Sequence, residues 1–249
     1  MARVLMPLPD RGFDPTEAAV PWRLLTDAGH EVVFATEHGG SAPAADPIAL
    51  DGFVFGRFGA DPEPKGFYHQ LERDPAFRNP VSWASLDASS FDGLVLAGGH
   101  APGVRQYLES RVLQAKVAEL WELGRPVGAI CHGVLIPART RSPETGKSLL
   151  ADRRTTAFPK YMERIAFLGT FWKLGRYTRT YPQYVEDEVR SALDGPDAFE
   201  RGPFVLLSRG TADDDKAAFA VVDANYVSSR WFGDAYLFAR RVLELVGPS

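Results

Sequence analysis

The stretch Val127-Gly128-Ala129-Ile130-Cys131-His132-Gly133-Val134-Leu135 holds the only cysteine among the 249 residues of the chain. An apolar, β-rich run leads into Cys131, and small or apolar residues that suit a packed helix follow it. This is the pattern of a nucleophile elbow, in which a strand ends, one residue sits on a sharp turn and a helix begins beneath it. Gly128 and Gly133 leave room for the close approach of strand and helix that such a turn needs.

A thiol at this position meets the positive end of a helix dipole, which favours the thiolate over the thiol. His132 follows directly and can hold or deprotonate a reaction partner. The alternative interpretation is that Cys131 is a buried, inert core thiol, the common fate of a lone cysteine.

Composition places the chain among soluble globular proteins, with 45% hydrophobic and 24% charged residues. The net charge of −4 and the lack of a basic cluster interleaved with aromatic residues predict no nucleic-acid partner. One cysteine excludes an internal disulfide and a cysteine-based zinc site. The five histidines lack the spacing of metal ligands, so we predict no metal and, without a phosphate-binding glycine-rich loop, no nucleotide. Apolar runs are too short to span a membrane, and a cytoplasmic location is expected.

Strand and helix patterns alternate along the chain, which predicts an α/β fold with a doubly wound, largely parallel sheet flanked by helices. The pattern loosens between residues 37 and 90, where Pro, Gly and scattered aromatic residues such as Phe55 and Phe58 predict an insertion with short helices. The expected strands are 3–6, 31–35, 91–97, 126–130 and 217–222, and the expected helices are 16–28 and 106–123.

Ligands bind beyond the carboxyl ends of the strands in such sheets. Besides Cys131-His132, two features fall there: Gly98-Gly99-His100, whose backbone N–H groups can face an oxyanion, and Glu17 in the first turn of a helix. Taken alone, Glu17 is more typical of a surface acid favoured by the helix dipole, and His100 is equally typical of a solvent-facing loop residue.

Three ordered motifs carry a resemblance to a known family: Pro15-Thr16-Glu17 with Pro21, Asp92 to His100 with Gly103, and Ala129-Ile130-Cys131-His132-Gly133. The chain resembles the PfpI/ThiJ superfamily, which has the flavodoxin-like fold of class I glutamine amidotransferases, and within it the larger chaperone/glyoxalase III-like branch. Residues 1–249 are then a single PfpI/ThiJ-like domain, with poorly matched insertions at about 37–90 and 160–200.

The resemblance implies roles for the matching residues. Cys131 corresponds to the nucleophile, Glu17 to a buried glutamate that hydrogen-bonds the thiol, and His132 to the histidine after the nucleophile. The backbone N–H groups of His132 and Gly99 would form the oxyanion hole. A family-like homodimer is also implied.

One position departs from the pattern of that branch. A catalytic acid follows an Ala-Phe-Pro segment there, whereas Lys160 follows Ala157-Phe158-Pro159 in this chain. Glu163, one helical turn further on, is the candidate for a third acid. The departure weakens the case for a complete Cys-His-acid triad and for peptidase activity.

The remaining groups suit a cofactor-independent cysteine enzyme. A thiolate attacks a carbonyl carbon, N–H donors meet the developing charge, and a protonated Glu17 shuttles a proton. The predicted reaction is the glyoxalase III-type conversion of small 2-oxoaldehydes to 2-hydroxy acids. The alternatives are an amidase or hydratase of the same superfamily, a thiol redox sensor, or a holdase chaperone that uses the aromatic segment 167–184. That segment is more typical of a lid or a dimer contact.

Overall fold

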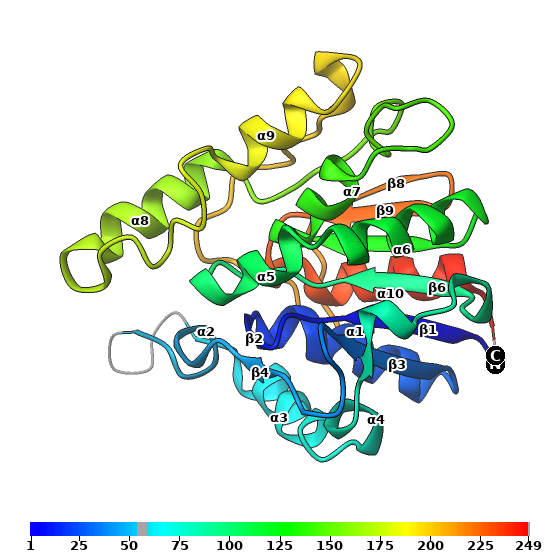
Figure 1. Ribbon diagram of the computed structural model, residues 1–249. Coiled ribbons are helices and arrows are strands. Elements are labelled where there is room, and N and C mark those ends of the chain that lie inside the picture. The colour runs from blue at the N-terminus through cyan, green and yellow to red at the C-terminus, as the bar shows by residue number, and fades with distance from the viewer. Residues whose placement is uncertain (54–58, 249) are drawn as a thin grey trace.

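A seven-stranded sheet forms the centre of the protein, with the strand order β5-β3-β1-β6-β7-β9-β8. The structure, a computed structural model, describes residues 1–53 and 59–248 (Figure 1). Neighbouring strands are parallel except for the pair β8–β9, which is antiparallel. The predicted doubly wound, largely parallel sheet is thereby confirmed.

The strands of this sheet and of a small two-stranded sheet, β2–β4, are short and mostly buried. Their bounds are β1 Arg3–Pro7, β2 Arg11–Phe13, β3 Glu31–Thr36, β4 Ala44–Ala45, β5 Val81–Ser82, β6 Gly93–Leu96, β7 Val127–Ile130, β8 Ala220–Asp223 and β9 Tyr226–Ser229. The helices are α1 Pro15–Asp27, α2 Pro47–Asp51, α3 Pro62–Leu71, α4 Pro75–Arg78, α5 Arg105–Leu108, α6 Arg111–Glu122, α7 Leu135–Arg139, α8 Lys160–Leu174, α9 Val185–Ser191 and α10 Ala235–Val246. Short 3-10 turns include η4 Cys131–Val134.

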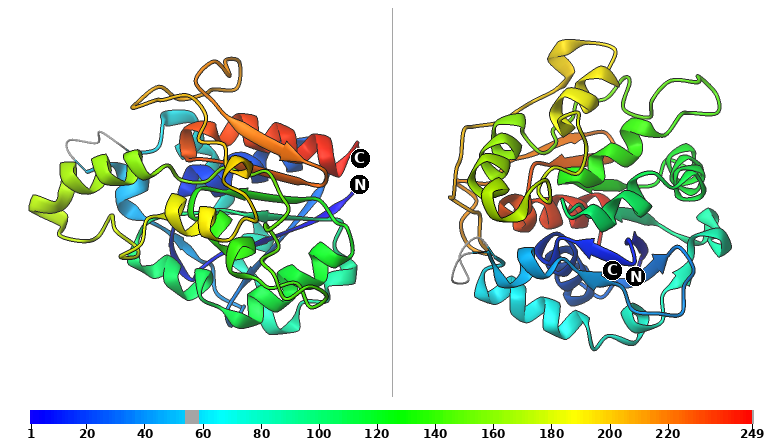
Figure 2. Two further views of the ribbon diagram at one scale, coloured as in Figure 1. Left: turned by 90° about the horizontal axis from the view of Figure 1, so that it is seen from above. Right: turned by 60° about the vertical axis from the view of Figure 1, so that its left-hand side comes forward.

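Helices cover both faces of the sheet (Figures 1 and 2). One face packs against α1 and α10, with α3 against α1, and the other against α6 and α7. α8 projects beyond the end of the sheet opposite the two termini (Figure 2). The strand order reverses at β1, between β3 and β6, so the segments after β1, β6 and β7 meet at the switch point where such folds bind ligands.

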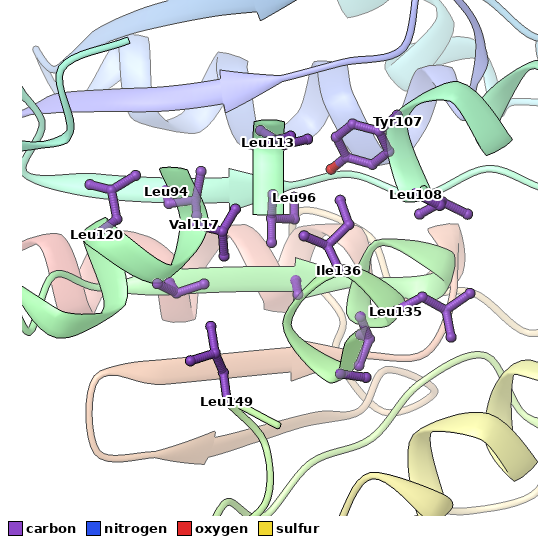
Figure 3. Close-up of a cluster of buried hydrophobic side chains, with 14 of the residues drawn as sticks. Leu94, Leu96, Tyr107, Leu108, Leu113, Val117, Leu120, Leu135, Ile136 and Leu149 are labelled. Carbon is purple, nitrogen blue, oxygen red and sulfur yellow. The ribbon is translucent and has the colours of Figure 1, made fainter. Parts of the chain in front are cut away.

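The sheet separates two apolar clusters. Figure 3 shows the cluster under α5, α6 and α7, where leucines of β6 meet Leu113, Val117 and Leu120 of α6. The opposite cluster joins β1 and β3 to α1 and α10. Burial of these side chains on both faces is the main force that holds the helices on the sheet.

The predicted helix at 16–28 forms as α1, because Asp14 caps its first turn. The Asp14 side chain accepts hydrogen bonds from the N–H groups of Thr16 and Glu17, at 2.8 and 3.2 Å. Pro15 occupies the first turn, where a missing N–H costs nothing. This cap places Glu17 in the first turn of the helix that follows β1 and the short strand β2.

Two predicted elements differ from the structure by more than two residues. The single helix expected at 106–123 is broken into α5 and α6, because the Ser110 hydroxyl caps a new helix by accepting from the Leu113 N–H at 3.2 Å. The strand expected at 217–222 begins only at Ala220, since Ala218 closes a turn by bonding to the Asp215 carbonyl.

The predicted insertions supply peripheral elements. Segment 37–90 contributes β4, three short helices and β5, which pairs with β3 at the edge of the sheet. The part of this insertion at residues 54–58, with Phe55 and Phe58, lies outside the described residues. Segment 160–200 forms α8 and α9. No helix in the described part of the chain is long and apolar enough to cross a membrane.

A Gly133→Ala substitution is expected to lower the free energy of unfolding by about 1–3 kcal/mol. An added Cβ would lie 2.2 Å from the Leu96 carbonyl oxygen, a backbone atom that cannot turn away. Denaturant unfolding measures the change.

Gly169→Ala in α8 is the matched control, because its Cβ would meet no atom within 4 Å. Alanine is also the better helix former by up to about 1 kcal/mol. Equal stability of the two variants would contradict the packing described at Gly133.

Candidate active site

Cys131 stands on a strained turn between β7 and η4. Its backbone φ is 59°, which lies in the left-handed region that residues other than glycine rarely adopt. The residue is 6% exposed. Strain of this kind persists only where the surroundings over-determine it, and it is typical of functional residues. The geometry therefore has the strand, sharp turn and helix of a nucleophile elbow.

Gly98, directly beyond β6, lies against this turn. A Cβ at Gly98 would be 2.7 Å from Glu17 Oε2, 2.7 Å from the His132 backbone nitrogen and 2.8 Å from Cys131 Cβ. Only glycine leaves space for the three groups to converge. The segments after β1, β6 and β7 thus meet around one thiol.

Glu17 is fully buried, which excludes the surface position that its place in a first helical turn suggested. Its Oε2 accepts the N–H of Gly98 at 2.8 Å. Its Oε1 is buried without a partner of ordinary hydrogen-bond geometry, and the Cys131 thiol is the neighbouring polar group. The Gly98 N–H therefore holds Oε2 of the carboxyl, while Oε1 stays available to the Cys131 sulfur.

Burial dominates the protonation of this pair. Desolvation, followed by the nearby Asp14 charge, raises the pKa of Glu17 well above its usual range. Desolvation, followed by the Glu17 charge, likewise raises the pKa of Cys131. The lowered thiol pKa expected from a helix dipole is therefore not what the structure favours, because desolvation and the Glu17 charge act in the opposite direction. Near neutral pH the pair carries at most one negative charge, which favours a protonated Glu17 beside any thiolate.

His132 is buried with a partner at each ring nitrogen. Nδ1 lies 3.4 Å from Cys131 Sγ, and Nε2 lies 3.2 Å from the Thr180 hydroxyl. The ring stacks at a tilt on Phe158, with 5.5 Å between centroids. Desolvation lowers the pKa of His132 to about 3, and the positive charges of Arg139 and Arg179 add to the effect. His132 is consequently a neutral imidazole at physiological pH.

The three residues predicted to bind an oxyanion are not equivalent. The Gly98 N–H is occupied by Glu17, so its role as an oxyanion donor is corrected to that of a spacer. The Gly99 N–H makes no hydrogen bond within the described residues, and the His132 N–H faces the thiol. The His100 carbonyl accepts a 2.8 Å hydrogen bond from the Thr180 hydroxyl.

Glu163 lies away from His132. Its carboxyl pairs with Arg179 at 2.9 Å and accepts the Val185 N–H at 3.1 Å, while burial raises its pKa to about 7. Both ring nitrogens of His132 have other partners, so Glu163 does not complete a triad. Lys160, where a family acid was expected, pairs with Asp187 at 2.6 Å.

The residue that takes the place of a triad acid is Thr180, which sequence reasoning missed. The only signal was the aromatic segment 167–184, interpreted as a lid or a dimer contact. Thr180 also lines a cavity of about 510 Å³, so one hydroxyl joins the cavity wall to His132. The cavity is lined by Pro102, Arg105, Leu174, Arg176, Tyr177, Arg179, Thr180, Tyr181 and Pro182.

Within the described residues, no group of three or more His, Cys, Asp or Glu side chains is arranged so that it could hold a metal ion. The groups gathered at the turn are a thiol, a carboxyl, an imidazole and backbone N–H groups.

Comparisons with known proteins agree with this geometry. The family profile described as ThiJ/PfpI family-like matches residues 8–194. An uncharacterized protein of Schizosaccharomyces pombe is 29% identical over 177 residues, which are 70% of this chain and 65% of that protein. The chain thus spans somewhat less than two thirds of that relative.

Two further relatives have named activities. A deglycase of Pyrococcus abyssi is 26% identical over 98% of this chain and 99% of its own length. Glyoxalase 3 of Candida albicans is 26% identical over 74% of this chain and 75% of its own. The crystal structure of glyoxalase III from Candida albicans superposes with a TM-score of 0.72 at 22% identity, covering 98% of this chain and 97% of that one.

The His132 ring is expected not to titrate between pH 8 and pH 5, because burial holds its pKa near 3. NMR of the imidazole protons, assigned by their loss in His132→Gln, measures this. The denatured chain is the control, since the same ring should there titrate near pH 6.5. A midpoint above pH 5 in the folded protein would contradict the buried, neutral imidazole.

Proposed function

The chain belongs to the ThiJ/PfpI family, and on this premise we propose that it is a cofactor-independent glyoxalase of the glyoxalase III type, converting small 2-oxoaldehydes to 2-hydroxy acids. The observation that carries the proposal is the convergence of Cys131, Glu17 and Gly98 at the switch point. The relative named glyoxalase 3 supports the same reaction.

The first step is addition of the thiol to the aldehyde carbon, C1, of the substrate. Sγ forms the new bond to C1 as its S–H bond breaks, and the carbonyl electrons move to oxygen. Glu17 gives its proton to that oxygen and takes the proton of the thiol, so the product is a hemithioacetal beside a protonated Glu17. We assign the Gly99 N–H, which makes no hydrogen bond within the described residues, and the His132 N–H as the donors that stabilise the developing negative charge. Glu17, protonated because it is buried, is the proton donor within reach.

The second step moves hydrogen between the two carbonyl carbons. A base removes the proton from C1, the electrons of the C–H bond form a C1=C2 double bond, and the C2 oxygen takes a proton to give an enediol. The base then returns its proton to C2, and the C1 hydroxyl gives up a proton in place of the one that the C2 oxygen took, so C1 becomes a thioester carbonyl. C1 is oxidised and C2 is reduced by the same two electrons, so no external oxidant or cofactor is needed.

Water then hydrolyses the thioester, which releases the 2-hydroxy acid and restores the thiol. The sum of the steps is the 2-oxoaldehyde plus one water giving one 2-hydroxy acid. Burial of Cys131 suits the first two steps, because it excludes water until the thioester has formed.

A deglycase activity is the second candidate, favoured by the relative that aligns over nearly the whole chain. N-acetyl-lysine pretreated with methylglyoxal tests it. Loss of the adduct faster than spontaneous release, measured with a chemical trap for free methylglyoxal, would favour this candidate.

Other functions stay predictions from sequence. These are an amidase or hydratase reaction, redox sensing by Cys131 and a holdase chaperone role. A homodimer and a cytoplasmic location are likewise predictions from the resemblance and the composition.

Purified protein is expected to form lactate from methylglyoxal without glutathione or added metal. Cys131→Ser should lower kcat by about 10³-fold or more, because the bond-forming sulfur is lost. Glu17→Gln should lower kcat by about 10²-fold, because the proton donor is lost. Enzymatic quantification of lactate measures all three proteins.

Glu119→Gln is the matched control, since it makes the same chemical change on the exposed surface of α6. Full activity in both Cys131→Ser and Glu17→Gln would sink the proposal, as would the absence of lactate from the wild type.

A further inference from the structure

Asp46 is a fully buried acid in which only one of the two carboxylate oxygens accepts hydrogen bonds from the described residues. It caps α2, and its Oδ1 accepts hydrogen bonds from the Ile48 N–H at 2.9 Å and from the Tyr177 hydroxyl at 2.8 Å. Its Oδ2 has no hydrogen-bond partner among the residues that the structure describes. A buried carboxylate oxygen without a donor is costly, so the group it faces matters.

The group that Oδ2 faces is the His100 ring. His100 Nε2 lies 3.7 Å from Oδ2, and the ring meets Tyr177 edge-on with 6.3 Å between centroids. The His100 side chain is 28% exposed and borders Tyr177 and Thr180, which line the cavity. His100 follows Gly98 by two residues, so this ring stands on the segment that passes the thiol.

The two histidines of the site therefore differ in their hydrogen-bond partners and in their exposure. His132 is enclosed between Cys131 Sγ and the Thr180 hydroxyl and has no carboxylate partner. His100 directs Nε2 toward the Asp46 carboxylate, and part of its side chain is exposed. An imidazole oriented by a buried carboxylate is the usual arrangement of a general base.

We propose that His100, oriented by Asp46, is the base that carries the proton from C1 to C2 of the bound substrate. This inference rests on the proposed function and assigns its second step. His100 takes the proton of the C1–H bond to become an imidazolium, and it returns a proton to C2 to become neutral again. His100 is thus a catalytic residue, and Asp46 is a positioning residue.

The surroundings of His100 favour the neutral imidazole, which is the form that can accept a proton from C1. Desolvation lowers the pKa of His100, while the Asp46 carboxylate raises it. The other titratable groups beside it, His132 and Tyr177, are neutral near pH 7, because burial lowers the pKa of the first and raises that of the second. His100 is therefore neutral at rest, and Asp46 stabilises the imidazolium that forms during the step.

Kinetics of His100→Gln and Asp46→Asn with methylglyoxal test this assignment. His100→Gln should lower kcat by about 10²-fold with a smaller change in KM. Asp46→Asn should lower kcat by about 10-fold, because asparagine keeps the helix cap but loses the charge. It should also move the acidic limb of the kcat profile to lower pH, since the charge that raises the pKa of His100 is gone.

The exposed pair His69–Glu72, 3.0 Å apart, supplies matched controls in His69→Gln and Glu72→Gln. Both should keep the wild-type kcat and pH profile. Thermal unfolding of each variant shows whether it is folded, and a merely structural role of Asp46 would not move the pH limb.

The outcomes separate the two proposals. Lactate formation by the wild type together with near-normal kcat in His100→Gln overturns the role of His100 alone. An unmoved acidic limb in folded Asp46→Asn overturns the role of Asp46. A wild type that forms no lactate overturns the glyoxalase proposal, and the proton transfer assigned to His100 falls with it.

Discussion

The strained backbone at Cys131 is the constraint on which the rest of the site depends. A φ of 59° turns the chain sharply from β7 into η4 and places the thiol beyond the end of the sheet. The turn is held because two glycines allow close approach: Gly133 lies against the Leu96 carbonyl, and Gly98 lies against Cys131 and Glu17. Packing on both faces of the sheet offsets the strain.

Burial then decides how protons are distributed around the thiol. Desolvation raises the pKa of both Glu17 and Cys131 and lowers that of His132. The resting site therefore favours a protonated carboxyl, a thiol and a neutral imidazole, instead of the imidazolium–thiolate pair of many cysteine enzymes. A protonated carboxyl beside the sulfur is what a carbonyl addition requires, because the oxygen that develops charge must receive a proton.

The two insertions decide which side chains contact His132 and His100. Residues from 160–200 bring the Thr180 hydroxyl to His132, while Glu163 is held by Arg179. The earlier insertion brings Asp46 beside His100. The Thr180–His132 pair is 48 residues apart in sequence and the Asp46–His100 pair is 54 residues apart, and no periodic pattern links either pair. Electrostatic neighbours of this kind come from tertiary packing alone.

Local patterns in the sequence were enough to predict the alternating α/β architecture and the turn at Cys131, because apolar periodicity, the Asp14 cap and the glycines act through local geometry. The ends of the strands also marked the Gly98-Gly99-His100 segment, whereas Glu17 became a site residue only through the family resemblance. Three features became visible only in the folded chain: Ser110 splits a helix, burial raises the pKa of the thiol, and Thr180 contacts His132. Desolvation and long-range hydrogen bonds depend on which segments pack together, and that information is not local.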